Sequence, residues 1–170
     1  MQKTKELLIE AYEEMKKNDI NKCVIASTSG ETAKLAYDIM KGKEIIVVRK
    51  HYGAKEKNIQ EMSKENENYL REKNIKIVTA THVFGGIGRS VRKKYNTWQI
   101  DEIIASTLRI FGSGVKVAIE ISMMATDAGY VDSGERIIAI GGNKVGASNA
   151  VIINAVNTSD FFDIKVNKII

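Results

Sequence analysis

The sequence contains no proline, one cysteine, two histidines and only 6% aromatic residues. Without proline, turns and helix ends must be made by glycine and by polar capping residues. The single cysteine, Cys23, has no partner for an intrachain disulfide and cannot build a thiolate metal site, so we expect it in the core. The sequence shows no Ser-His-Asp spacing, paired acidic motif or metal-ligand cluster, and it therefore predicts no metal site and assigns no reaction.

The chain also has neither a long apolar run nor a block of one charge. Its 170 residues carry a formal net charge of +5, and the acidic and basic residues are interleaved rather than clustered. With so few aromatic residues, this pattern argues against a nucleic-acid partner. No stretch reaches the roughly 18 apolar residues of a membrane span, so we expect no membrane partner and a cytoplasmic protein. The length and the 44% hydrophobic content predict one domain over residues 1–170.

Apolar periodicity predicts a three-layer α/β/α fold. Residues 7–15 have the spacing of an amphipathic first helix. Short apolar runs at 23–26, 45–48 and 75–78 then alternate with helical patterns, one of which we place at 58–73. A β-α-β-α-β series of this kind forms right-handed parallel crossovers.

The second half is expected to complete a mostly parallel, doubly wound sheet with an antiparallel edge strand. A glycine-rich loop at 84–90 precedes a helix at 100–111, for which Asn96 and Gln99 are expected to form a capping box. The remaining predicted segments are a buried helix at 114–128, a strand at 137–140, a loop at 141–149, a strand at 151–156 and an alternating edge strand at 162–166.

Ligands of wound sheets bind at the loops that leave the carboxyl ends of the strands, near the point where the strand order reverses. Four predicted loops share that edge of the sheet, and we expect a phosphate-bearing small molecule to bind there. The loops comprise residues 27–32, 49–53, 79–90 and 141–149.

The leading anion site is the first of these loops, Ser27-Thr28-Ser29-Gly30-Glu31-Thr32. It offers hydroxyl groups and free N–H groups at a helix start, where a partial charge of about +0.5 favours a phosphate. The alternative is a capping box between Thr28 and Glu31, which would satisfy the backbone donors without any ligand. This loop alone leaves both interpretations open, because one helix-dipole interaction contributes only about 0.3–1 kcal/mol.

The other loops bring glycines, cations and rings to the same edge. Glycines permit close backbone approach to a ligand, and Lys and Arg side chains bind phosphate. Rings stack on, or hydrogen bond to, a planar ligand. Taken alone each such residue is more often structural, and their shared placement is what favours a ligand. The predicted set adds Gly142 and Lys144 from the fourth loop, Gly85, Gly86 and Arg89 from the third, and the rings of His51, Tyr52, His82 and Phe84.

Two segments resemble the C-terminal α/β domain of pyruvate kinase, in the form of the stand-alone archaeal proteins that share its fold. Residues 25–33 resemble the family's strand, Ser-Gly turn and helix start. Residues 128–142 resemble its later helix exit, strand and glycine loop. The chain departs from the family pattern at Glu31, which is acidic within the turn, and at 81–113, which is longer than the family's usual connection.

The resemblance implies a binding module, because in pyruvate kinase this domain binds a regulatory sugar phosphate and does not perform phosphoryl transfer. The stand-alone relatives are associated with flavin mononucleotide (FMN), which is therefore the expected cofactor. Ser27, Thr28, Ser29, Gly30 and Thr32 would then hold its phosphate, assisted by Lys144 or Arg89. The alternatives are a non-catalytic regulatory or metabolic module for a sugar phosphate or another nucleotide, and a purely structural oligomer with capped loops. Homo-oligomerisation is left open.

Overall fold

The computed structural model describes residues 2–143 and 145–170, and its helices and strands alternate over the first half of the chain, as expected of an α/β protein. The strands are β1 (Lys22–Ala26), β2 (Glu44–Arg49), β3 (Lys76–Thr79), β4 (Arg136–Asn143), β5 (Gly146–Asn154) and β6 (Lys165–Ile169). The α-helices are α1 (Gln2–Lys17), α2 (Glu31–Ile39), α3 (Lys64–Glu72), α4 (Ile87–Tyr95), α5 (Ile100–Leu108) and α6 (Ser113–Asp127). Short 3-10 helices are η1 (Val83–Gly85), η2 (Arg109–Phe111) and η3 (Thr158–Asp163).

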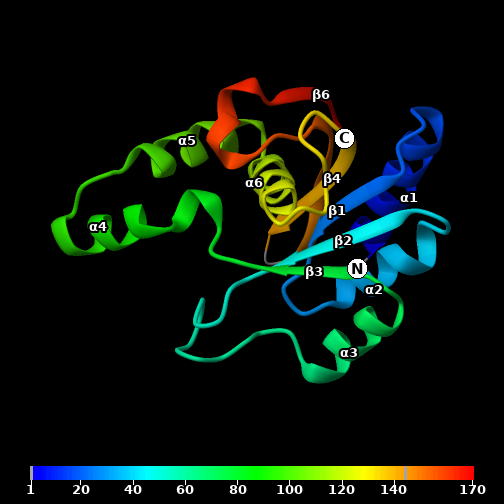
Figure 1. Ribbon diagram of the computed structural model, residues 1–170, viewed down its shortest axis with the longest axis horizontal. Helices are drawn as coiled ribbons and strands as arrows, with labels where there is room; N and C mark the ends of the chain where they lie inside the picture. Colours follow the sequence, from blue (N-terminus) through cyan, green and yellow to red (C-terminus); the bar gives the residue numbers. More distant parts are fainter. Residues whose placement is uncertain (1, 144) are drawn as a thin grey trace.

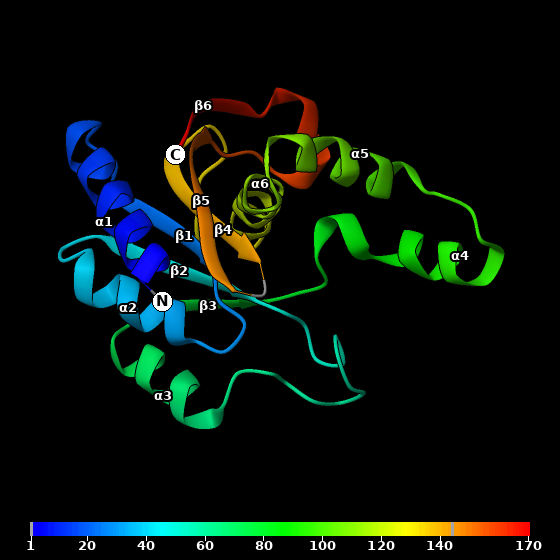
Figure 2. The same cartoon turned by 180° about the vertical axis from the view of Figure 1, so that it is seen from behind.

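One sheet with the strand order β3-β2-β1-β4-β5-β6 forms the middle layer. The strands from β3 to β4 are parallel, whereas β5 pairs antiparallel with β4 and β6 pairs antiparallel with β5 at the edge. Helices α1, α2 and α3 lie on one face of the sheet, and α5 and α6 lie on the other (Figures 1 and 2). The predicted three-layer, mostly parallel sheet with an antiparallel edge is confirmed.

Both faces of the sheet are buried, which explains why its strands are apolar without alternation. In β1, Val24 packs into the layer around α6, whereas Cys23 and Ile25 pack under α1 and α2. Cys23 is fully buried as expected, and burial raises the pKa of its thiol to about 12. A thiol in this environment stays protonated at neutral pH, so Cys23 is a core residue.

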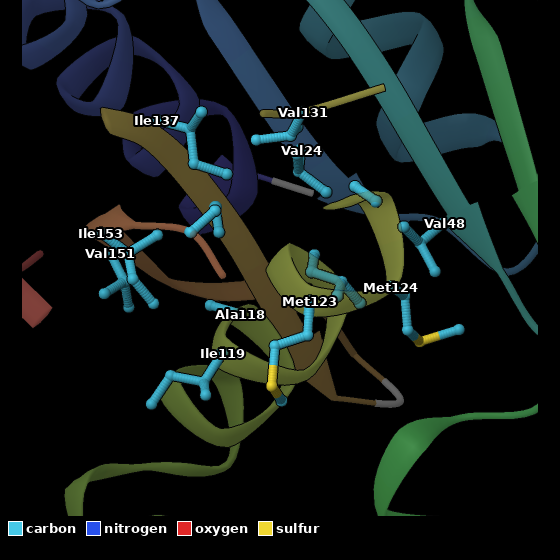
Figure 3. Close-up of a cluster of buried hydrophobic side chains, with 14 of the residues drawn as sticks. Val24, Val48, Ala118, Ile119, Met123, Met124, Val131, Ile137, Val151 and Ile153 are labelled. Carbon is cyan, nitrogen blue, oxygen red and sulfur yellow. The ribbon is translucent and has the colours of Figure 1, made fainter. Parts of the chain in front are cut away.

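Helix α6 is the centre of the second layer. Its small and branched side chains, among them Ala118 and Ile119, pack against Ile137 of β4 and against Val151 and Ile153 of β5 (Figure 3). Nearly the whole of α6 is buried, so the prediction of a buried helix at 114–128 is confirmed. Any change in the distance between α6 and β4 would disturb this whole layer, because protein interiors are close-packed.

Two predicted segments in the first half need correction. The helix expected at 58–73 begins only at Lys64, because the Ser63 hydroxyl caps it by accepting the N–H of Asn66 at 3.1 Å. The segment before Ser63 forms turns instead. The glycine-rich loop expected at 84–90 is wrong, since the chain there forms η1 and the first turn of α4.

The second half departs from expectation at three places. Of the expected loop at 141–149, residues 141–143 and 146–149 are strand instead, because β4 and β5 extend into them and pair antiparallel, with a bulge at Gly141 and Gly142. The capping box of Asn96 and Gln99 is not formed, since Asn96 ends α4 in a left-handed conformation and the Gln99 amide donates to the Thr97 carbonyl. The edge strand begins at Lys165 because η3 occupies the residues before it.

Within the part of the chain that the structure describes, no helix combines the length and the apolar character that crossing a membrane requires.

The contact between β4 and α6 requires glycine at position 141. A Cβ atom there would overlap the carbonyl oxygen of Gly114 and would lie 2.7 Å from the amide nitrogen of Ala118. Because both atoms belong to the backbone, they cannot move aside. Gly141→Ala is therefore expected to lower the free energy of unfolding by about 2–3 kcal/mol, which corresponds to a fall in melting temperature of about 5–10 °C.

Gly85→Ala is the matched control, since a Cβ there meets only the flexible end of the Arg89 side chain. It should change the melting temperature by much less. Equal melting temperatures for the two variants in a differential scanning calorimetry experiment would contradict the packing argument.

Candidate functional site

The candidate site lies where the sheet reverses its strand order. Strand β1 sits between β2 and β4, and the chain leaves β1 toward α2 on one face but reaches β4 from α6 on the other. Such a switch point leaves a crevice outside the carboxyl ends of the strands. A cavity of about 850 Å³ opens here. Its lining includes Ser27, Thr28, Ser29, Glu31 and Thr32 after β1, Val48 and Lys50 from β2 and its exit, Gly142 and Asn143 of β4, His82 after β3, and Val117 of α6.

The turn that joins β1 to α2 exposes backbone donors to this cavity. Gly30 is the residue before the helix, and its φ of 97° is a left-handed conformation that side chains rarely adopt. The Ser29 hydroxyl accepts the N–H of Glu31, and the Ser27 hydroxyl accepts the N–H of Ala33, both at 3.4 Å. Among the described residues, the N–H groups of Thr28, Ser29, Gly30 and Thr32 contact no acceptor.

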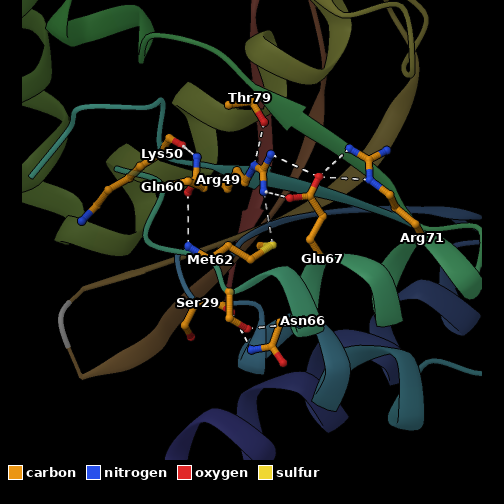
Figure 4. Close-up of polar contacts among 10 residues, drawn as sticks. Ser29, Arg49, Lys50, Gln60, Met62, Asn66, Glu67, Arg71 and Thr79 are labelled. Carbon is orange, nitrogen blue, oxygen red and sulfur yellow. Dashed lines mark hydrogen bonds and ion pairs between the residues drawn. The ribbon is translucent and has the colours of Figure 1, made fainter. Parts of the chain in front are cut away.

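The capping box between Thr28 and Glu31 is not formed. Instead, the Glu31 carboxylate accepts the side-chain amide of Asn66 at 2.8 Å and contacts the Lys34 ammonium at 3.4 Å. The amide of Asn66 also donates to the backbone carbonyl of Ser29 at 2.8 Å (Figure 4). Helix α3 therefore holds both the turn and the Glu31 side chain through Asn66. The N–H groups at the start of α2 stay free.

Helix α3 is itself fixed to the sheet by a buried arginine at the end of β2. Arg49 is 4% exposed, and its guanidinium donates to Glu67 at 2.9 Å and to the Thr79 hydroxyl at 2.7 Å (Figure 4). Arg71 pairs with the other oxygen of Glu67 at 2.8 Å. These hydrogen bonds, from Arg49 first and then from Arg71, lower the pKa of Glu67 to about 2 in spite of its burial. The ion pair places Asn66 beside the turn of residues 27–32.

A second polar cluster borders the cavity from the side of α6. The Glu120 carboxylate, which is 1% exposed, accepts His82 Nδ1 at 2.9 Å, Lys116 Nζ at 2.6 Å and the N–H of Phe84 at 3.0 Å. Burial opposes ionisation of Glu120, but the His82 hydrogen bond and the Lys116 charge outweigh it and hold its pKa at about 2. Burial lowers the pKa of Lys116, and the Glu120 charge offsets only part of that effect.

Sequence reasoning missed Glu120 and Lys116, since the helix that carries them reads as apolar nearly all round. The signal that could have found them is two opposite charges four residues apart within a buried helix, because buried charges must be paired. Their partner His82 was predicted as a site residue. Its pairing with Glu120 was not predicted, because 38 residues separate the two in the sequence.

The structure brings some predicted site residues together and separates others. Six of them line the cavity, namely Ser27, Thr28, Ser29, Thr32, His82 and Gly142, and Gly30 forms the adjoining turn. Lys144 lies outside the described residues.

Six others do not line the cavity, namely His51, Tyr52, Phe84, Gly85, Gly86 and Arg89. The Tyr52 ring is half exposed beneath the Arg49 guanidinium, and Phe84 is buried edge-on against Phe161. Gly85 and Gly86 belong to the η1–α4 junction instead of a cradle, and Arg89 is exposed on α4. Their predicted binding roles therefore lack geometric support.

The fold and the cavity define a doubly wound α/β protein with a crevice at its switch point. Residues 5–154 match the family model of the pyruvate kinase alpha/beta domain, and the chain belongs to that family. The chain is similar to Cryptosporidium parvum pyruvate kinase in complex with ADP, at 14% identity and a TM-score of 0.42, over 96% of this chain and 23% of that one. It is also similar to the NH3-dependent NAD synthetase of Campylobacter jejuni in complex with nitrate, at 16% identity and a TM-score of 0.36, over 66% and 48% of the two chains. This chain thus spans about a quarter of the length of that pyruvate kinase.

The ion pair between Arg49 and Glu67 predicts a specific pH dependence. The folded-state pKa of Glu67 is lowered to about 2 from an ordinary 4.5, so its ionised form stabilises the fold fully above pH 4.5. That contribution is lost as the pH falls toward 2. Glu67→Gln is therefore expected to lower the free energy of unfolding by about 2 kcal/mol at pH 7, with a smaller loss at pH 3.

Urea unfolding of wild type and variant at both pH values measures the difference. Glu72→Gln is the control, because Glu72 lies exposed on the same helix. A deficit of Glu67→Gln that stays constant from pH 7 to pH 3 would show that the carboxylate does not stabilise the fold through its charge.

Proposed function

We propose that this protein binds a phosphate-bearing small molecule, with the phosphate at the turn of residues 27–32. The observation that carries the proposal is the set of N–H groups of Thr28, Ser29, Gly30 and Thr32, which meet no acceptor among the described residues and border a cavity. Helix starts of this kind bind anions through their N–H groups and the helix dipole together. Several donors acting on one anion add up to more than the 0.3–1 kcal/mol of the dipole alone.

The acidic residues of the cavity do not oppose this proposal, because each contacts a cation or an amide. Glu31 is held by Asn66 and Lys34, Glu61 pairs with Lys50 at 2.8 Å, and Asp38 lies 3.9 Å from the Lys41 ammonium. Lys34 and Lys50 also line the cavity, so a phosphate entering it would compete for their charges. The attraction must therefore come mainly from the backbone N–H groups. Lys144, which was expected to assist, stays a prediction.

Within this class, FMN is the ligand that we propose first. A cavity of about 850 Å³ falls within the roughly 300–1,000 Å³ of small-molecule sites and suits a mononucleotide. A sugar phosphate or another nucleotide, bound without catalysis, is the second candidate. One observation favours it: the expected stacking rings Tyr52 and Phe84 lie outside the cavity lining, so a flavin ring would have to bind without them.

The oligomeric state and the cellular location of the protein do not follow from the binding site, and both stay predictions. Large apolar side chains are exposed on the arm formed by α4, α5 and η2, which projects from the sheet (Figure 1). They include Ile87, Trp98, Ile100, Ile110 and Phe111. Exposed apolar groups of this kind support homo-oligomerisation, because they are typical of contact surfaces. Cytoplasmic location stays an expectation from the sequence.

A charge placed at Thr28 tests the phosphate site. Thr28 lines the cavity and its side chain caps nothing, so Thr28→Asp adds a carboxylate beside the free N–H groups with little change in shape. It is expected to weaken the binding of inorganic phosphate and of FMN at least tenfold, because two negative charges about 4 Å apart repel by a few kcal/mol near a protein surface.

Thr28→Asn is the matched control, since it has the same shape without the charge. Isothermal titration calorimetry measures both variants. If Thr28→Asp binds phosphate as tightly as Thr28→Asn does, the phosphate is not at this turn.

The identity of the ligand is tested by identifying the small molecule that co-purifies with the protein. FMN as the natural ligand predicts a yellow protein after gentle purification, or uptake of added FMN that raises the melting temperature. Ligand at 100 times its dissociation constant adds about 2.7 kcal/mol of stability. Mass spectrometry of the molecules released on denaturation names the occupant. A colourless protein that takes up no FMN but releases a sugar phosphate would replace FMN with the second candidate.

A further inference from the structure

The arm that projects from the sheet carries a helix that the rest of the chain leaves uncovered. Helix α4 has nine residues, and none of them is buried. It lies at the outer side of the arm, where its neighbours are α5 and η1 (Figures 1 and 2). Isolated helices shorter than about 12–15 residues are marginal in water, and most helices in proteins depend on tertiary packing. Helix α4 therefore calls for a partner that covers it.

The outer end of α4 is both apolar and basic. The rings of Tyr95, its last residue, and of Trp98, in the turn that follows, are exposed. The helix carries four basic residues and no acidic one. Of these, Arg92 pairs with a carboxylate of α5 at 2.7 Å, whereas the exposed Lys93 and Lys94 form no ion pair with any described residue. This end of the helix thus offers rings and free positive charge to a partner.

A second cavity, of about 590 Å³, opens at the base of the arm, where α5 and the start of α4 meet η3 and α6. It shares no lining residue with the cavity beside the turn of residues 27–32. Its apolar lining is accessible, since the Phe162 side chain is 91% exposed. An apolar surface of this kind is typical of a protein contact. The lining includes Phe84, Ile100, Ile104, Phe161 and Phe162.

The rim of this second cavity is acidic. Asp101 belongs to its lining, and Asp160 and Asp163 lie on η3 on either side of the two phenylalanines. None of the three forms an ion pair within the described ranges 2–143 and 145–170. The rim therefore complements the basic end of α4 in charge. Within one chain the two surfaces do not meet, because neither Tyr95 nor Trp98 lines the cavity.

We propose that two copies of this chain pair through their arms, with the outer end of α4 in each copy covering the apolar cavity at the base of the other copy's arm. Two arms that lie antiparallel bring the outer end of each beside the base of the other. The dimer is closed and two-fold, because every contact that one copy makes is also made in reverse. The pairing is independent of the phosphate site, and it specifies which surfaces meet.

The exposed apolar surface is large enough for a stable dimer. A standard interface buries about 800 Å² on each partner, and a little over half of that area is apolar. Six large side chains of the arm and of η3 each expose on the order of 100 Å² and together supply that apolar share. They are Ile87, Tyr95, Trp98, Ile100, Ile103 and Phe162.

Charge reversal on each surface tests the pairing. The arm variant is Lys93→Glu/Lys94→Glu, and the rim variant is Asp160→Lys/Asp163→Lys. Each is expected to raise the dissociation constant of the dimer at least about tenfold, because like charges then face one another. Sedimentation equilibrium from micromolar to millimolar concentration measures it. An equimolar mixture of the two variants should dimerise as wild type does, since both contacts of the mixed dimer again join opposite charges.

Lys3→Glu/Lys5→Glu is the matched control, because it makes the same change in net charge as the arm variant at exposed positions of α1, across the sheet (Figure 2). It should dimerise as wild type does. The inference is overturned by wild type that stays monomeric at every concentration, or by an arm variant that dimerises like this control. A mixture of arm and rim variants that stays monomeric also overturns it, as do oligomers that keep growing with concentration.

A second test addresses the apolar contact. Phe162→Ser is expected to weaken the dimer at least about tenfold and, because the side chain is exposed in the monomer, to leave the melting temperature of the dilute protein nearly unchanged. Ile59→Ser, which alters an exposed apolar residue outside both surfaces, is its control. Amide hydrogen exchange in residues 87–95 should slow as the wild-type concentration rises, but not in Phe162→Ser. Exchange in α4 that is independent of concentration in dimeric wild type would overturn the inference.

Discussion

The site depends on the left-handed turn at Gly30. Strand β1 ends inside the sheet, and α2 must begin within four residues on one face of it. A φ of 97° at Gly30 makes that change of direction, and Gly30 has no side chain to cap the helix that follows. In the described part of the chain, only the Ser29 and Ser27 hydroxyls accept N–H groups of its first turn, those of Glu31 and Ala33. Backbone N–H groups at a helix start need an acceptor. Because the protein supplies few, the turn is where we propose that an anion binds.

Two networks on opposite faces of the sheet hold the turn and the residues around the cavity. On one face, the buried pair of Arg49 and Glu67 fixes α3, and Asn66 then holds the turn through the Ser29 carbonyl. On the other face, Glu120 of α6 fixes His82. A binding site requires side chains that are themselves locked by their neighbours. The crevice at the switch point is thus bounded by groups from both helical layers, and neither layer alone would form it.

The layers and most strands could be predicted from the sequence because each is encoded by a local pattern of apolar residues. Short apolar runs such as 45–48 indicate buried parallel strands, and the amphipathic spacing of 7–15 indicates a surface helix. The glycine-rich segments misled the prediction because glycine permits several conformations. The Gly141–Gly142 pair forms a β-bulge where close packing against α6 excludes a side chain, and that contact is invisible in the sequence.

The site was predictable only where it is one continuous segment. The Ser27–Thr32 turn could be found from its hydroxyls and glycine, but whether Glu31 caps the helix depended on Asn66, which is 35 residues away. The cluster of His82 with Lys116 and Glu120 likewise joins β3 to α6 only in three dimensions. Rings predicted from their place after a strand, such as Tyr52, failed to reach the cavity because the chain turns away beyond β2.

A titration of the ¹⁵N-labelled protein with inorganic phosphate, followed by amide chemical shifts, tests the anion receptor most directly. The account predicts that the largest shift changes fall on the N–H groups of Thr28, Ser29, Gly30 and Thr32 and saturate together with one dissociation constant. Shift changes confined to surface lysines, or absent from this turn at saturating phosphate, would contradict it.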